Sequence, residues 1–142
     1  MAEIVDFKVY NHEGIETMSL ETGQKFRVWM KIEFYDEVKN PAVGIMIRNP
    51  QGQNLLGIHS YHERRMNFGE KREGDVLCVS LESVMILNPD NYTLSLGIAD
   101  VESDYDFKSI DVRNNVAVIP VYGKQVFFGL IDNPGRIIIE NS

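Results

Sequence analysis

Two histidines and a glutamate within five residues, His59, His62 and Glu63, are the first candidates for chemistry in this chain. Imidazole and carboxylate groups at this spacing bind zinc when the two histidines share one face of a helix. Here the preceding residues alternate in the manner of a β-strand, and an offset of three places the two rings on opposite faces. The sequence therefore argues against a metal site at this run.

A second group of polar side chains is acidic. Carboxylates occupy every second position from Asp100 to Asp106, which superficially suggests calcium, but the glycine and the final glutamate of an EF-hand loop are absent. We interpret residues 100–111 as a solvated acidic loop. The chain has no phosphate-binding GxxxxGK[ST] loop and no GxSxG elbow, and nothing selects a carboxylate pair for glycoside hydrolysis. The sequence predicts a protein that is not an enzyme and needs no cofactor.

A binding surface is the remaining interpretation, and it begins with Trp29, the only tryptophan. An aromatic ring can cover the C–H face of a sugar while polar side chains bond to the hydroxyl groups at its edge. Residues on the same side of this strand, and on neighbouring strands if pairing brings their faces together, could complete such a surface. The predicted carbohydrate-binding residues are Trp29, Lys31, Glu33, Met46, Arg48, His59 and Tyr61.

These residues also have interpretations that involve no ligand. Trp29 can simply cover a loop, as buried tryptophans of β-sandwiches do. Arg48 and His59 can be solvated residues of a strand surface.

The elements that would hold these side chains are strands. Apolar and polar residues alternate strictly over residues 25–35, and residues 40–61 predict a hairpin around an Asn-Pro-Gln-Gly turn. Small side chains alternate with apolar ones over residues 92–99, which predicts a flat or concave surface. Other strands are expected at residues 3–11, 17–20, 75–83, 115–122, 125–131 and 136–140. About eight or nine strands without helical periodicity predict an all-β antiparallel β-sandwich.

Composition limits the classes of partner and the cellular location that we expect. A formal net charge of −7 argues against nucleic acid and anionic membranes as partners. The single cysteine, Cys78, lies in an apolar strand pattern and is predicted to be a small core residue. The chain contains no apolar run of about 20 residues and its start is unlike a signal peptide. We expect one cytoplasmic domain over residues 1–142.

Several segments, taken in order and with their spacing, resemble a known family. They are residues 23–28 (GQKFRV), 41–52 (PAVGIMIRNPQG), 55–60, 75–81, 87–98 (LNPDNYTLSLGI) and 116–121, followed by Gly129. Together they resemble the C-terminal carbohydrate-binding domain of Wzt-type ATP-binding subunits, from ABC transporters that export O-antigen polysaccharide.

The resemblance implies an immunoglobulin-like sandwich that binds the end of a polysaccharide and gives an ABC exporter its substrate specificity. It implies as partners the polysaccharide chain end, an ATPase domain and a membrane subunit, at the inner face of the membrane. It also implies a homodimer that exchanges a C-terminal strand within residues 125–140. The chain itself has no ATPase motif, so we expect an excised or separately encoded module. The alternative is an interaction domain whose apolar segment 125–131 binds a protein by strand addition.

Overall fold

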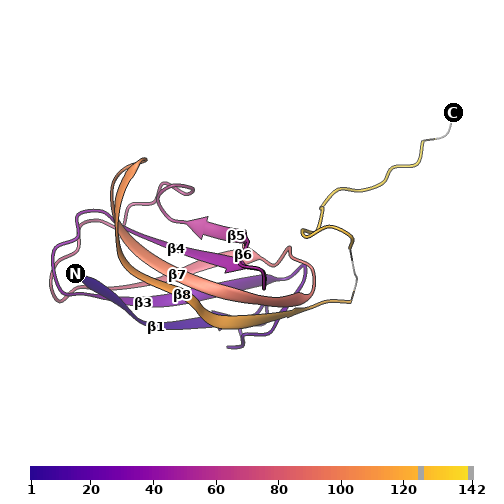
Figure 1. Ribbon diagram of the computed structural model, residues 1–142, viewed down its shortest axis with the longest axis horizontal. Coiled ribbons are helices and arrows are strands. Elements are labelled where there is room, and N and C mark those ends of the chain that lie inside the picture. Colours follow the sequence, from indigo (N-terminus) through magenta and orange to yellow (C-terminus); the bar gives the residue numbers. More distant parts are fainter. Residues whose placement is uncertain (125–126, 141–142) are drawn as a thin grey trace.

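The protein is a sandwich of two β-sheets in a computed structural model that describes residues 1–124 and 127–140 (Figure 1). The three-stranded sheet has the order β1 (Ala2–Tyr10), β3 (Lys25–Phe34), β6 (Val76–Val84). The five-stranded sheet has the order β2 (Leu20–Glu21), β8 (Asp106–Tyr122), β7 (Asp90–Ser103), β4 (Pro41–Arg48), β5 (Asn54–His59). The predicted all-β sandwich is confirmed. The described ranges hold no helix, and hence none that could cross a membrane.

Alternation along the strands builds the core. On β3, every second side chain from Phe26 to Phe34 is at most 2% exposed, while the residues between them face outward. On β4, Val43, Ile45 and Ile47 point inward in the same way. Each fully buried side chain of this size contributes about 1.5–3 kcal/mol by leaving water. The two sheets are therefore held by their inner faces, which leaves both outer faces available for other tasks.

The segment predicted as an acidic loop, residues 100–111, is instead part of the long β7–β8 hairpin. Asp100 pairs with Lys108, and Ser103 pairs with Asp106 near the tip. Pairing uses backbone groups, so outward-facing carboxylates can stay hydrated while Val101 is buried at 2% exposure. The hairpin curves away from the body at its tip (Figure 1).

Two further expectations need correction. Leu20 pairs with Val121 in a parallel arrangement, so the sandwich is not wholly antiparallel. Cys78 is exposed rather than part of the core. Its neighbours Leu77 and Val79 pack toward the core, and alternation on β6 turns Cys78 outward.

Over its described residues, the C-terminal segment forms neither of the strands predicted for it. Residues 125–126 of the first predicted strand lie outside the described residues. From residue 127 to 140 the chain forms only an isolated bridge between Leu87 and Ile131. The rest extends away from the sandwich (Figure 1). Around this bridge, the backbone N–H of Asn88 donates to Leu130 O and that of Asp132 donates to Ile86 O, so pairing extends over about three residues and is too short to form a strand.

Candidate functional site on the outer face of the five-stranded sheet

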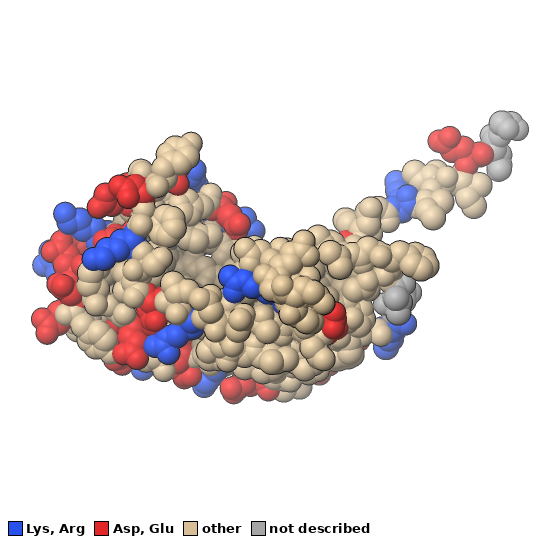
Figure 2. All heavy atoms as spheres, viewed as in Figure 1, with Lys and Arg blue, Asp and Glu red and all other residues tan. Residues whose placement is uncertain are grey.

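A pocket of about 250 Å³ lies on the outer face of the five-stranded sheet. Its floor consists of small residues of three adjacent strands: Gly44, Gly57, Ser95, Gly97 and Ala99. Because such side chains barely rise above the backbone, the face is hollow, as the small residues of 92–99 predict. Figure 2 shows the molecule hollowed beside the raised β7–β8 hairpin.

Larger side chains surround this floor and give the pocket its chemistry. Apolar contact comes from a methionine and a phenylalanine, while a guanidinium, an imidazole, a carboxylate and an amide supply polar groups. These lining residues are Met46, Arg48, His59, Glu63, Phe107 and Asn114. A mixed lining of this kind is typical of sites for small polar ligands.

His59 is held as a neutral imidazole whose one N–H group is free to donate a hydrogen bond. Its Nδ1 accepts hydrogen bonds from the backbone N–H groups of Tyr61 at 3.2 Å and His62 at 3.1 Å. The ring proton is therefore on Nε2. Burial lowers the pKa of His59, and the nearby His62 lowers it further, while Glu63 acts in the opposite direction.

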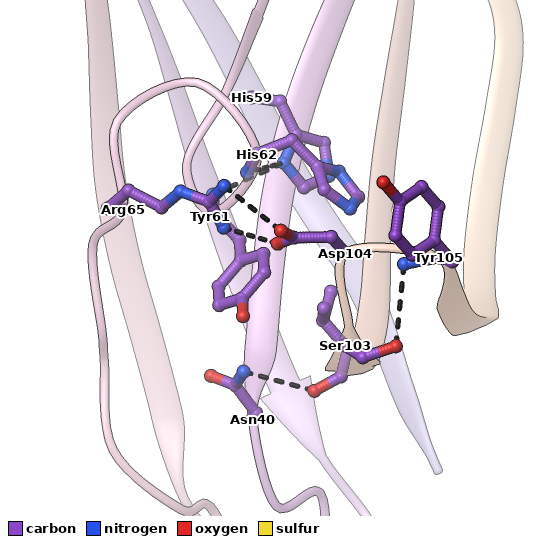
Figure 3. Close-up of polar contacts among 9 residues, drawn as sticks. Asn40, His59, Tyr61, His62, Arg65, Ser103, Asp104 and Tyr105 are labelled. Atoms are coloured by element: carbon purple, nitrogen blue, oxygen red, sulfur yellow. Dashed lines mark hydrogen bonds and ion pairs between the residues drawn. The ribbon is translucent and has the colours of Figure 1, made fainter.

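The two histidines do not lie on opposite faces, contrary to the strand-based expectation. The chain turns after β5, and the ring centroids of His59 and His62 are 4.5 Å apart (Figure 3). His62 Nε2 is buried and has no partner among the described residues. No group of three metal-binding side chains occurs in residues 1–124 and 127–140.

An ion pair fixes this end of the pocket. The guanidinium of Arg65, in the segment after β5, donates to the carboxylate of Asp104 at the tip of the β7–β8 hairpin (Figure 3). The hydrogen bond from Arg65 is the main factor that lowers the pKa of Asp104. Phe107, a lining residue that follows the tip, contacts His62 edge-on with the ring centroids 6.0 Å apart. The ion pair therefore joins the hairpin tip to the segment after β5 next to the pocket.

Of the seven predicted site residues, Met46, Arg48 and His59 line this pocket. Tyr61 lies next to it in the turn after β5, with the guanidinium of Arg65 5.2 Å from its ring centroid (Figure 3). Tyr61 supplies the backbone N–H that orients His59, but its ring is not part of the lining.

The other three predicted residues, Trp29, Lys31 and Glu33, lie on a different sheet. They are on β3, which pairs with β1 and β6, whereas the hairpin of residues 40–61 pairs with β7. Trp29 is half-buried on the outer face of the three-stranded sheet, with Lys8 Nζ 5.6 Å from its ring centroid. The expected single surface therefore divides into two, on opposite outer faces, and a ligand at Trp29 becomes the alternative to a ligand in the pocket.

Sequence reasoning missed the contribution of β8 to the pocket, which includes Phe107, Ser109 and Asn114. Phe107 and Ser109 lie within residues 100–111, for which the sequence predicts a loop rather than a strand. The Asn-Asn doublet was the available signal for the third, because Asn115 adopts a positive φ of 52° where the register with β7 shifts. Asparagine tolerates this conformation better than most residues, and such bulges redirect neighbouring side chains.

The wall formed by His59 is expected to loosen in acid. The unfolded imidazole has a pKa near 6.5, and the folded value lies below it, so protons bind more tightly when the turn opens. The contribution of the neutral His59 ring to the stability of this turn is fully present above about pH 6.5, and it is lost as the pH drops toward the folded pKa. The protection factors of the Tyr61 and His62 amides, which correct exchange rates for their intrinsic dependence on pH, should therefore fall over this range.

His59→Asn is the matched control for this effect, since asparagine keeps an acceptor near Nδ1 but does not titrate. The fall in protection factor should disappear in this variant. An equal fall in His59→Asn would assign the effect to another group.

Fold and pocket together define a β-sandwich domain with a ligand-sized site on one sheet face. A family model described as the Wzt C-terminal domain matches residues 1–133. A crystal structure of the C-terminal domain of Wzt is similar with a TM-score of 0.90 and 27% sequence identity, over 98% of this chain and 84% of that one. No match was found among curated protein sequences. The chain belongs to the Wzt C-terminal domain family, and this membership implies a role in an O-antigen ABC transporter.

Proposed function

We propose that the pocket on the five-stranded sheet binds the terminal part of an O-antigen-type polysaccharide, without catalysis. The observation that carries the proposal is the glycine-rich floor bordered by apolar and hydrogen-bonding side chains. Such a floor lets a sugar ring approach the sheet closely. The volume of about 250 Å³ lies just below the roughly 300–1,000 Å³ of drug-sized ligand sites, which favours a chain end over a long segment.

Each part of the lining has a task in this proposal. Met46 and Phe107 contact the C–H groups of the sugar, and the free Nε2–H of His59 donates to a hydroxyl oxygen. The bound chain end selects which polysaccharide the transporter exports, through the partner ATPase domain and the membrane subunit at the inner face of the membrane.

Calorimetric titration with polysaccharide isolated from the source strain tests this function. His59→Asn retains an acceptor for the turn but lacks the Nε2–H donor, so affinity should fall roughly fivefold to tenfold, as for one lost hydrogen bond. Trp29→Ala, on the other sheet, is the control and should bind as the unmodified domain does. The reverse pattern would move the site to the three-stranded sheet, and no binding by the unmodified domain would refute the function.

We also propose that two copies associate by exchanging their C-terminal segments. Ile137 and Ile139 are 97% and 84% exposed, and exposure of neighbouring large apolar side chains to water is unfavourable. Strand β6 is an edge of the three-stranded sheet, and its Leu77 and Val79 are only partly buried against the core. A strand from a second copy beside β6 would cover both sets of residues. Strand addition to a different protein is the competing outcome.

A further inference from the structure

We propose that the end of the pocket formed by Arg48 binds an acidic group of the saccharide, either the carboxylate of a uronic acid or a phosphate ester. This inference rests on the proposed function and specifies the class of sugar that the site accepts. It depends on how Arg48 is held, on which charges surround it, and on the donors beside it.

Arg48 is oriented by neutral partners and keeps most of its donors free. Its Nε donates to Asn54 Oδ1 at 2.6 Å, and its Nη1 donates to Ser95 Oγ at 2.7 Å. A guanidinium carries five N–H groups, so three are left for a ligand. Two fixed contacts hold the planar group in place, and the cost of ordering a long side chain is therefore met before a ligand arrives.

No carboxylate of the described residues lies within ion-pair distance of Arg48, although Asp and Glu outnumber Lys and Arg by 21 to 14 in the chain. Glu63 is the only acidic residue in the pocket lining, and it bonds to the backbone N–H of His59. His59 pairs with Gly44, four residues before Arg48 on β4, or about 13 Å along the strand. The two side chains form no ion pair, so Glu63 is not a direct counterion of Arg48.

Two further side chains near the guanidinium can donate hydrogen bonds to a ligand. Ser95 Oγ accepts from Arg48 and also from the backbone N–H of Asn115 at 2.9 Å. No acceptor for its own proton occurs among the described residues, which leaves that hydroxyl free to donate to a ligand. Asn114 also lines the pocket, where β8 bulges opposite Ser95, so its side-chain amide is available to the same ligand group.

An uncompensated cation with adjacent hydroxyl and amide donors matches an oxyanion. Hydrogen bonds from an arginine to a carboxylate or phosphate are roughly twice as strong as those between neutral groups. A neutral sugar could use the same donors but would leave the half-buried charge without a counterion. The two ends of the pocket therefore differ: the Arg48 end selects an anion, and the His59 end contacts hydroxyl and C–H groups.

Chemical editing of the ligand tests this inference. Polysaccharide from the source strain is titrated in its native form, after reduction of carboxyl groups to alcohols, and after removal of phosphate with hydrofluoric acid. Affinity should fall roughly 10- to 100-fold in one of the two edited samples, which also identifies the acid. Unchanged affinity in both would overturn the acidic-group inference and leave the proposed function standing. Absence of binding by the native polymer would overturn both.

Variants connect the effect to this side chain. Arg48→Gln should lower the affinity for native polysaccharide by a similar factor and should bind native and edited samples equally. Arg48→Lys keeps the charge but loses the fork of donors, and should retain part of the preference for the acid. Arg27→Gln, on the three-stranded sheet, is the matched control and should behave as the unmodified domain. A preference for the acidic polymer that persists in a folded Arg48→Gln domain would contradict the inference.

Discussion

Replacement of Gly97 by leucine is expected to abolish most polysaccharide binding while the domain stays folded. A Cβ atom added at this position on β7 meets only the backbone oxygen of Asp111, at 3.9 Å, so the sheet accepts a side chain without strain. The leucine would project into the pocket, whose floor Gly97 forms. Overlap with a ligand costs about 1–3 kcal/mol or more, which corresponds to an affinity loss of roughly 10- to 100-fold or greater.

Gly97→Ala is the graded control for this experiment. One methyl group leaves most of the pocket open, so the affinity should change little. Thermal unfolding of both variants should match that of the unmodified domain or improve slightly, because glycine weakens a strand. Full affinity in a folded Gly97→Leu domain would place the ligand elsewhere.

The double variant Ile137→Asp/Ile139→Asp is expected to be a monomer, whereas the unmodified domain is expected to be a dimer. In the strand-exchange proposal, Ile137 and Ile139 lie on the same face of the C-terminal strand and are buried against the partner's core. A buried, unpaired carboxylate is strongly unfavourable, and two of them exceed what an edge strand gains by pairing. Sedimentation velocity at several concentrations gives the mass directly.

Valine at both positions is the matched control, because it stays apolar and β-branched and should preserve the dimer. An unmodified domain that is monomeric at every concentration would contradict strand exchange. Polysaccharide binding should survive in the double aspartate variant, because the proposed pocket lies on the other sheet.

Sequence reasoning succeeded where local alternation decides the outcome. The five inward side chains of β3, from Phe26 to Phe34, are those that a two-residue period selects. The hairpin of residues 40–61 was predictable for the same reason, with a turn of suitable residues at its centre. Met46, Arg48 and His59 share one pocket because they belong to that single hairpin, so no long-range information was needed to group them.

Two of the wrong predictions concern features that depend on pairing between segments distant in the sequence. The sequence of β3 contains no signal that it pairs with β6 rather than with the hairpin, so Trp29 was grouped with residues of the other sheet. The alternating carboxylates of residues 100–106 favour a loop over residues 100–111, although the backbone pairs regardless of hydrated side chains. The contact between the tilted rings of His59 and His62 depends on the turn at the end of β5, which an offset along a strand does not predict.

Chemical-shift mapping of the ¹⁵N-labelled domain tests the pocket most directly. As oligosaccharide released from the source-strain polysaccharide is added, the amide signals of Gly44, Gly57 and Gly97 should shift together. The indole N–H signal of Trp29, the only tryptophan, should stay in place. Shifts that move the indole and spare the three glycines would contradict the account.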